Sequence, residues 1–359
     1  MTLAVNIAQS GSNNATFRNR IINGAMVLDQ RNAGASVTIN SAAWTYIVDR
    51  FCCLGQSADG VYTAQQSSTA PTGFVNSLLI TVTTADASVG AGQIYTLRQT
   101  IEGFNTADLN WGTANAKTVT LSFWVRSSLT GTFGGALNNE GTRSYPFTYS
   151  ISTANTFEYK TITIAGDTSG TWGTTNSHGV RITWGLGVGT TYSGTAGAWA
   201  GSEYFSATGA TSVVGTNGAT LYITGVQLEA GTTASPFEYR QYGTELGLCQ
   251  RYYEKSFAQG TVPGTTTDVG RIINAFGTTS TAYIAGFITY KVTKRASATP
   301  TVYAPSNGSS GNINAYNFGV ATNVVAPSLD NPMDNGFGFY FNGVTANAYG
   351  VHYAVSAEL

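Results

Sequence analysis

Short segments in which apolar and polar residues alternate recur along this chain, and they limit the folds that it can adopt. The clearest is KTVTLSFWVRS, where Val119, Leu121, Phe123 and Val125 occupy every second position. A period of two places these side chains on one face of a β-strand, so the segment is predicted to be a half-buried strand. An antiparallel β-sandwich or jelly roll is predicted because similar alternation occurs in SLLITVT, IYTLRQTI and GVRITWGLGV, each bounded by turn residues.

A strand with a bulge is predicted in ITGVQLEAGTTASPFEYR, which begins at Ile223. Gly225 permits the bulge, which would direct both Ile223 and Leu228 into the core. A Gly-Thr-Thr turn follows, and we expect Phe237 and Tyr239 to cover the end of the sandwich. The segment is therefore predicted to be a closing strand and not a reaction centre.

The length of the chain favours two domains, because 359 residues exceed what one hydrophobic core usually organises. Residues 1–20 are polar and weakly periodic, and we expect them to form an arm that docks on another protein. Alternating segments fill residues 21–242 and again residues 258–359, which predicts two β-sandwiches. The predicted fold class is all-β: two antiparallel, jelly-roll-like sandwiches joined by a short helix, after an extended N-terminal arm.

The helical linker is predicted over residues 243–257, where apolar residues recur near a helical period. Thr244 is a candidate residue for capping its N-terminus. Leu246, Cys249 and Tyr253 lie in this segment, and we expect them to form an oligomer interface near a threefold axis.

Charge is scarce in this chain, with 10% charged residues against about 25% in average proteins. The net charge of -1 and the lack of a large basic cluster argue against nucleic-acid binding. With 20 Tyr, 17 Phe and 6 Trp, the chain contains enough aromatic surface to favour a folded β protein over disorder. Few charged side chains also make a surface adhesive, which oligomerisation would hide.

Targeting signals and disulfides are not expected. The N-terminus MTLAVNIAQSGSNN has neither the basic start nor the apolar segment of a secretory signal, and no run of about 18 apolar residues predicts membrane insertion. We therefore expect synthesis in the cytoplasm. Cys52, Cys53 and Cys249 cannot all pair, and we expect three reduced, buried cysteines.

Candidate catalytic residues are few. Proton-transfer catalysis usually needs a histidine or a matched pair of carboxylates, and the two histidines, His178 and His352, fall in different predicted domains. His178 follows a turn and could stack on a ligand, although an ordinary loop role is the simpler interpretation. We expect His352 to pack or to form hydrogen bonds. The chain is therefore predicted not to be an enzyme.

No metal site or cofactor is predicted, because neither C-x-x-C nor H-x-x-x-H occurs. Structural calcium stays open, since calcium binds carbonyls and single carboxylates, and Glu229 and Asp49 are the weak candidates. Glycoside hydrolysis needs two carboxylates on one cleft. The acidic residues, among them Glu140 and Glu203, are scattered in the sequence, which does not pair them.

Tryptophans on surfaces that should be wet are the main candidates for ligand binding. Trp124 lies on the polar side of its predicted strand, and Trp172 and Trp199 lie in the turns GTWGTT and GAWAGS. An exposed ring among hydroxyls and amides can stack on the apolar face of a sugar. The alternative is that an oligomer partner covers Trp124 and that the other two rings plug the ends of the sandwich.

Several long phrases resemble a family of bacteriophage virion proteins described as tail-fibre-like or minor structural proteins. These phrases are RNRIINGAMVLDQRNAGASVT, TIEGFNTADLNWGTANAKTVTLSFWVRSSLTGTF, YITGVQLEAGTTASPFEYRQYGTELGLCQRYYEK, YKVTKRASATPTVYAPS and the terminal HYAVSAEL. The resemblance implies a carbohydrate-binding-module-like jelly roll followed by a second β domain, commonly in a homotrimer on the particle surface. It implies no catalytic motif.

Three hypotheses follow. The first is a virion surface protein, a tail fibre or a head fibre, whose residues 1–20 dock on capsid or tail proteins while the sandwiches hold host-surface glycans through several weak contacts at once. The second is an architectural decoration protein of capsid or tail that contacts only other virion proteins. The third is a polysaccharide depolymerase, which requires two facing carboxylates.

Overall fold

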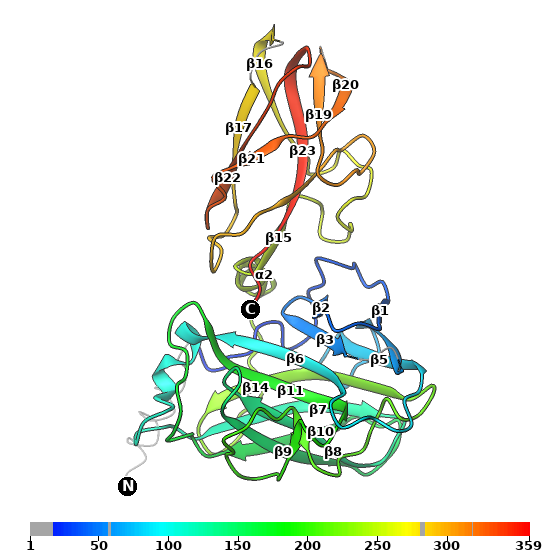
Figure 1. Cartoon of the computed structure of the whole chain (residues 1–359), viewed down its shortest axis with the longest axis vertical. Helices are drawn as coiled ribbons and strands as arrows, with labels where there is room; N and C mark the ends of the chain where they lie inside the picture. The colour runs from blue at the N-terminus through cyan, green and yellow to red at the C-terminus, as the bar shows by residue number, and fades with distance from the viewer. Residues whose placement is uncertain (1–16, 57–58, 281–283, 318) are drawn as a thin grey trace. The chain divides into compact units, whose positions relative to one another are not determined.

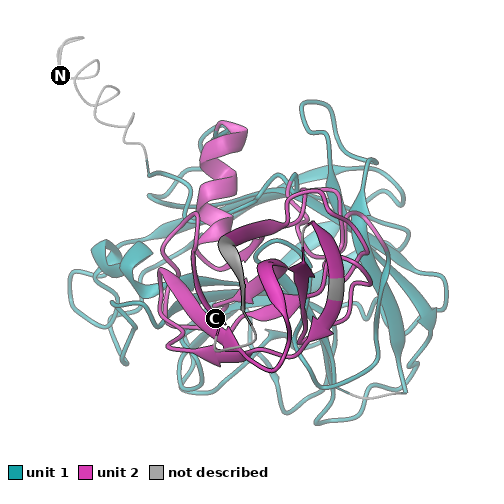
Figure 2. Cartoon of the chain, turned by 90° about the horizontal axis from the view of Figure 1, so that it is seen from above, with its two compact units in different colours: residues 1–27, 36–240, 359 teal, residues 28–35, 241–358 magenta. Residues whose placement is uncertain are grey.

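The structure is a computed structural model that describes residues 17–56, 59–280, 284–317 and 319–359. The described chain divides into two compact units, coloured separately in Figure 2. Unit 1 contains residues 17–27, 36–240 and Leu359, and unit 2 contains residues 28–35 and 241–358. The sequence predicted that residues 28–35 belong to the first sandwich, whereas the structure places them in unit 2. Their contacts with unit 2 join residues far apart in the chain, and the local strand pattern does not show such contacts.

Unit 1 is a β-sandwich of two antiparallel sheets, most of whose strands are labelled in Figure 1. Sheet A contains, in spatial order, β1 (Val37–Ile39), β4 (Val61–Ser67), β5 (Ser77–Thr84), β14 (Thr220–Ala230), β7 (Val119–Ser127) and β10 (Glu158–Ile164). Sheet B contains β2 (Thr45–Val48), β3 (Phe51–Gly55), β6 (Ile94–Glu102), β11 (His178–Val188), β8 (Gly131–Asn138) and β9 (Ser144–Ile151). A short parallel pair, β12 (Ser193–Gly194) and β13 (Ser206–Ala207), and two 3-10 turns, η1 (Gly103–Asn105) and η2 (Ala107–Leu109), complete the regular elements described in this unit.

The core of unit 1 lies between the two sheets and confirms the predicted alternation. In β7, Val119, Leu121, Phe123 and Val125 are all fully buried. Phe123 meets Trp184 of β11 edge to face, with ring centroids 5.6 Å apart. Because aromatic rings in this geometry stabilise a fold by about 0.5 to 1.5 kcal/mol beyond their buried area, the contact helps to hold the sheets together.

The predicted bulge is confirmed in β14. Its pairing with β7 shifts register between Thr224 and Gln227, and Gly225 has a φ of 61°. Both Ile223 and Leu228 are consequently fully buried. The strand lies inside sheet A, between β5 and β7, whereas the sequence suggested only that it closes the domain.

A segment without long strands, residues 189–219, covers part of the outer face of sheet B. Glycines at the points of approach make this possible. A Cβ atom on Gly134 of β8 or on Gly185 of β11 would lie 2.4 or 2.6 Å from Oγ of Ser206, and one on Gly187 would lie 2.4 Å from Val214. Larger residues at these positions would displace the covering segment.

Unit 2 is also built of antiparallel sheets around its own core. One sheet is arranged around β23 (Ala346–Ser356), which pairs with β15 (Tyr253–Lys255), β16 (Ile272–Ser280), β18 (Thr301–Tyr303) and β19 (Ile313–Asn317), and β19 also pairs with β20 (Val320–Val325). The other contains β17 (Ile284–Thr289), β22 (Gly336–Phe341) and β21 (Ser328–Asp330). A buried ion pair, Lys294 with Glu254 at 2.8 Å, lies in this unit.

The helix predicted over residues 243–257 is shorter than expected. Helix α2 runs from Tyr242 to Gln250, and Gln241, not Thr244, is its N-cap residue. Residues Tyr253–Lys255 instead form β15, which pairs with the end of β23. The helical prediction beyond Gln250 was wrong because pairing with a distant strand determines the backbone there, and the local spacing of apolar residues does not show that partner.

The predicted N-terminal arm overlaps with the core of unit 1. Residues 1–16 lie outside the described residues, but Asn19 and Arg20 are 1% and 6% exposed. The amide of Arg20 donates to the carbonyl of Leu228, and its guanidinium binds both carboxylate oxygens of Asp108 at 2.6 and 2.7 Å. Any docking arm therefore ends before Asn19.

The cysteines agree with the prediction, since Cys52, Cys53 and Cys249 are buried and none of them forms a disulfide. Burial raises the pKa of Cys53 well above its usual value, so the thiol form persists. Within the described ranges, the helices are too short or too polar to cross a membrane.

Candidate functional site

A row of aromatic side chains on the outer face of sheet A is the main candidate site. Trp124 of β7 faces outward and is partly exposed, as its position on the polar side of the strand predicted. Tyr159 of β10 is its cross-strand partner, with ring centroids 5.4 Å apart. The Tyr159 side chain is 43% exposed. Two neighbouring strands thus present adjacent rings to solvent.

The row continues through Gly225 of the bulge. A Cβ atom at Gly225 would lie 2.7 Å from the Phe74 ring and 3.0 Å from the Trp124 ring, so the two rings approach each other over this glycine. Phe74 in turn contacts Phe237 and Tyr239, with centroids 5.1 and 5.5 Å apart. We call Trp124, Tyr159, Phe74, Phe237 and Tyr239 the aromatic row.

The segment after β14 carries Phe237 and Tyr239 across the outer face of sheet A. Thr120 and Thr163 donate hydrogen bonds from their hydroxyls to the carbonyls of residues 231 and 232, at 2.9 and 3.1 Å. The Tyr239 hydroxyl donates to the carbonyl of Gly73 at 2.7 Å, and the residue stays 60% exposed. These two rings therefore extend the aromatic row.

The chemistry of this row suits a neutral, ring-shaped ligand with one apolar face. Aromatic faces offer dispersion contacts and a negative quadrupole to C–H groups, while the polar positions beside them can bind hydroxyl groups. Thr161 and Thr163 lie exposed on β10 in line with Tyr159. The row thus presents rings and hydroxyls that suit the binding of such a ligand.

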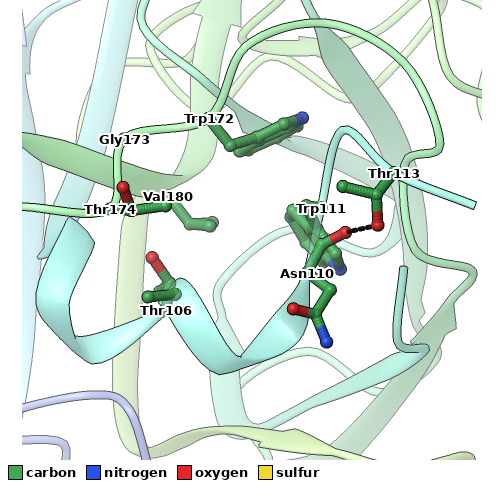
Figure 3. A pocket seen from close by; sticks show the side chains of 9 residues that line it. Thr106, Asn110, Trp111, Thr113, Trp172, Gly173, Thr174 and Val180 are labelled. Carbon is green, nitrogen blue, oxygen red and sulfur yellow. Dashed lines mark hydrogen bonds between the residues drawn. The ribbon is translucent and has the colours of Figure 1, made fainter. Parts of the chain in front are cut away.

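The other two predicted tryptophans meet elsewhere, in a tryptophan cluster with Trp111. Ring centroids lie 4.6 Å apart for Trp111 and Trp172, 5.3 Å for Trp111 and Trp199, and 5.4 Å for Trp172 and Trp199, all edge to face. A pocket of about 140 Å³ lies beside Trp111 and Trp172, and Thr106, Asn110 and Thr113 contribute its polar lining (Figure 3).

The hydrogen bonds of this cluster identify its rings as packing elements. The indole N–H of Trp111 donates to the carbonyl of Lys117, that of Trp172 to Ser169 and that of Trp199 to Ala165, at 2.8, 3.2 and 2.7 Å. Trp111 and Trp172 are 7% and 8% exposed. The rings thus join three turns of the sandwich. Trp111 and Trp172 leave little ring surface for a ligand, whereas Trp199 is partly exposed.

His178 lies in a charged cluster and away from the aromatic row. Its Nδ1 is 2.5 Å from Oε1 of Glu140 and 2.9 Å from a guanidinium nitrogen of Arg181. Burial lowers the pKa of His178, the positive charge of Arg181 lowers it further, and Glu140 opposes both effects. The histidine therefore acts within an ion-pair network at the start of β11.

Two carboxylates that are distant in sequence, Glu140 and Glu203, meet at this network. Arg181 binds Glu140 at 2.9 Å and lies 3.5 Å from Glu203. A glycosidase needs one carboxyl group in apolar surroundings that keep it protonated. Both carboxylates here lie beside the same guanidinium, so the arrangement forms a charge-paired network.

The weak calcium candidates have protein partners. Glu229 accepts hydrogen bonds from the amide and the hydroxyl of Ser235 and from the side chain of Gln227. Asp49 is 1% exposed, and its backbone carbonyl accepts a bond from Asn23. In the part of the chain that the structure describes, no group of three or more His, Cys, Asp and Glu side chains could hold a metal ion.

His352 and the predicted oligomer residues lie inside unit 2. His352 is fully buried, stacks on Phe257 at 4.0 Å and bonds to Ser256 and Thr267, as its packing interpretation requires. Cys249 and Tyr253 are 1% and 7% exposed, so their side chains offer little surface to a partner subunit. Leu246 alone of the three expected interface residues is partly exposed.

Several members of these sites could not be chosen from the sequence. The sequence EYKTITI could have placed Tyr159 on the strand face opposite to Lys160 and Ile162. It could not have shown that Tyr159 pairs with Trp124 of the neighbouring strand. Phe74 and Trp111 lie in turns, where no periodicity indicates a direction. Their roles depend on contacts that only the folded chain shows.

No protein-family model matches this chain, and no curated protein sequence matches it. Solved structures with a similar arrangement were found. One is the enzymatically active domain of bacteriophage CBA120 tailspike protein 4, with 14% identity, a TM-score of 0.30, and coverage of 59% of this chain and 21% of that chain. The likeness thus spans about a fifth of the tailspike chain.

Two further structures are carbohydrate-binding proteins. A family 11 carbohydrate-binding module from Clostridium thermocellum in complex with a β-1,3-1,4-mixed-linked tetrasaccharide has 10% identity and a TM-score of 0.27, covering 52% of this chain and 92% of that one. The N-terminal cellulose-binding domain of β-1,4-glucanase C from Cellulomonas fimi has 12% identity and a TM-score of 0.22, covering 56% and 91%. These likenesses are too remote for a function to be carried from them to this chain.

Proposed function

We propose that this chain is a non-enzymatic, glycan-binding protein of a bacteriophage virion surface and that the aromatic row is its saccharide contact. The observation that carries the proposal is the exposure of adjacent rings, Trp124 with Tyr159 and Phe74 with Tyr239, on one sheet face. Isolated exposed rings are common on proteins, but a contiguous group of them marks an interaction surface. The neighbouring threonine hydroxyls favour a polar, hydroxylated ligand over a purely apolar one.

The virion part of the proposal rests on the long phrases that resemble phage tail-fibre-like and minor structural proteins. It is supported by the low content of charged residues and by compact sandwiches, which suit a protein that acts outside cells. In a homotrimer, three copies of the row would bind one glycan surface together, and weak single contacts would add to a firm attachment.

The test compares exposed rings inside and outside the row. Purified protein is applied to an array of bacterial surface polysaccharides, and the bound oligosaccharides are then titrated with Tyr159→Ala, Tyr239→Ala and Phe104→Ala variants. Phe104 is a matched control because it is 60% exposed, like Tyr239, and lies in the turn η1. We expect each row variant to weaken binding about two- to tenfold, which corresponds to one aromatic contact, and the control to bind normally.

An architectural role is the second candidate, because an exposed aromatic face would also suit contact with another virion protein or another copy. The molar mass of the same variants in solution separates the two roles. If Tyr159→Ala and Tyr239→Ala dissociate an oligomer while no polysaccharide on the array binds the intact protein, the row is an assembly interface. Release of reducing ends from a bound polysaccharide would instead show an enzyme.

A further inference from the structure

A second pocket of unit 1, distinct from the aromatic row and from the tryptophan cluster, contains a buried guanidinium whose Nε has no hydrogen-bond partner. The pocket has a volume of about 240 Å³ and lies on the outer side of sheet B. Its floor is formed by Arg98 of β6 and Arg181 of β11. Trp44, Tyr192 and Phe205 contribute an aromatic wall, and Glu203, which lies 3.5 Å from Arg181, also lines the pocket.

Arg98 is the unusual member of this floor. It is 4% exposed, and its guanidinium carbon lies 3.4 Å from the centre of the Trp44 ring. Its Nε is buried and has no hydrogen-bond partner, and no carboxylate among the described residues lies within ion-pair distance of its guanidinium. A cation–π contact alone replaces only part of the hydration that a buried guanidinium loses.

Arg181, in contrast, already has its counter-charges in Glu140 and Glu203. Burial lowers the pKa of Arg181, and the positive charge of Arg98 lowers it further, so the two guanidinium groups lie close enough to repel each other. The Nε of Arg181, a second lining residue of the pocket, is also buried without a partner. Unsatisfied polar groups are rare in folded proteins, and the two guanidinium groups of this pocket offer N–H donors that a ligand could bind.

We propose that this pocket binds the carboxylate of an acidic sugar, such as a hexuronic acid, with Arg98 as the anchoring residue. A guanidinium offers parallel N–H donors that match the two oxygens of a carboxylate. The aromatic wall supplies an apolar surface for the sugar ring, and the volume is slightly below the range of about 300 to 1,000 Å³ of pockets for drug-sized ligands, which suits one monosaccharide. The inference rests on the proposed glycan-binding function and specifies which glycans the protein selects.

The experiment uses the full chain and a matched pair of small probes, methyl glucuronide and methyl glucoside, in NMR titrations at low salt. We expect the glucuronide to bind roughly ten- to a hundredfold more tightly, which is the contribution of hydrogen bonds to a charged group. The preference should disappear in Arg98→Met and persist in Arg126→Met. Arg126 is a suitable control because it also lies over an aromatic ring, Tyr222, at 4.9 Å, but does not line this pocket.

Each outcome has a definite meaning. Equal binding of the two probes by the wild-type protein overturns the inference, and if oligosaccharides still bind at the aromatic row, the proposed function survives. Absence of all saccharide binding removes both. Inorganic phosphate that binds at Arg98 while the glucuronide does not would show a site for another kind of anion and would also overturn the inference.

A purely structural role of Arg98 is tested by stability. Since Arg98→Met removes an unpaired buried charge and keeps the contact with Trp44, we expect the thermal midpoint of unit 1 to stay constant or to rise. A lower midpoint together with an unchanged preference for the glucuronide would show that Arg98 only supports the fold.

Discussion

The glycine at the bulge of β14 gives a sharp test of how the aromatic row is built. In Gly225→Ala, two costs arise. The backbone has a φ of 61°, which costs an L-residue about 1 to 2 kcal/mol. The new Cβ atom would also lie 2.7 Å from Phe74 and 3.0 Å from Trp124, and overpacking of this kind costs about 1 to 3 kcal/mol.

A matched glycine isolates the second cost. Gly218 has a φ of 76°, but a Cβ atom there would meet nothing within 4 Å. Gly218→Ala therefore carries the same backbone cost and the same effect on the unfolded chain, without the steric overlap. The difference between the two variants should be about 1 to 3 kcal/mol in the free energy of unfolding, all of it due to overlap with the row.

Denaturant unfolding followed by tryptophan fluorescence measures this difference. All six tryptophans of the chain, from Trp44 to Trp199, lie in unit 1, so the signal reports on that unit. We also expect Gly225→Ala to weaken saccharide binding, because the rings of Phe74 and Trp124 must separate. Equal stability of the two variants, or unchanged binding by Gly225→Ala, would refute the close contact of these rings.

Three further predictions concern other parts of the chain. Lys294→Met should destabilise unit 2 by about 3 to 5 kcal/mol, because it leaves the buried carboxylate of Glu254 without its cation. Lys160→Met, at the more exposed pair with Glu158, should cost less than about 1 kcal/mol. Far-ultraviolet circular dichroism during urea unfolding measures both costs, and similar values would contradict the reasoning. Burial lowers the pKa of His352, so the imidazole of the unfolded chain is protonated at a higher pH than that of the folded chain. The stability of unit 2 should therefore fall as the pH drops below about 6.5. His352→Gln should remove this part of the loss, and a pH profile of stability that stays the same in the variant would contradict the prediction. Deletion of residues 1–16 should keep unit 1 folded and abolish incorporation into particles. Deletion of residues 1–20 should in addition lower the thermal midpoint of unit 1, because the Arg20–Asp108 pair is lost. Equal midpoints of the two deletion variants would show that the Arg20 contacts do not stabilise unit 1.

The strands of unit 1 could be predicted because the alternation of apolar and polar residues within each strand shows which side chains are buried. Alternation in β7 identified both the buried residues and the outward direction of Trp124, and Gly225 identified the bulge. Each of these features depends on residues a few positions apart. The fold class and the exposed face of β7 therefore followed from the sequence.

Features that depend on distant partners were missed or misjudged. Helix α2 ends at Gln250 because β15 pairs with β23, about a hundred residues later. Arg20 was assigned to a docking arm because its partner, Asp108, is far away in the sequence. Arg98 gave no signal for the same reason. Alternation places it on a strand face, but only the folded chain shows that none of the described carboxylates forms an ion pair with it.

The most direct test of the account is where a bound saccharide contacts the protein. The indole N–H signals of Trp124 and Trp184 are followed by NMR while an oligosaccharide selected on the polysaccharide array is added, because Trp124 lies in the row and Trp184 is fully buried. The account predicts a saturable shift of the Trp124 signal, no change for Trp184, and loss of the shift in Tyr159→Ala. A saccharide that binds with the Trp124 signal unmoved would contradict it.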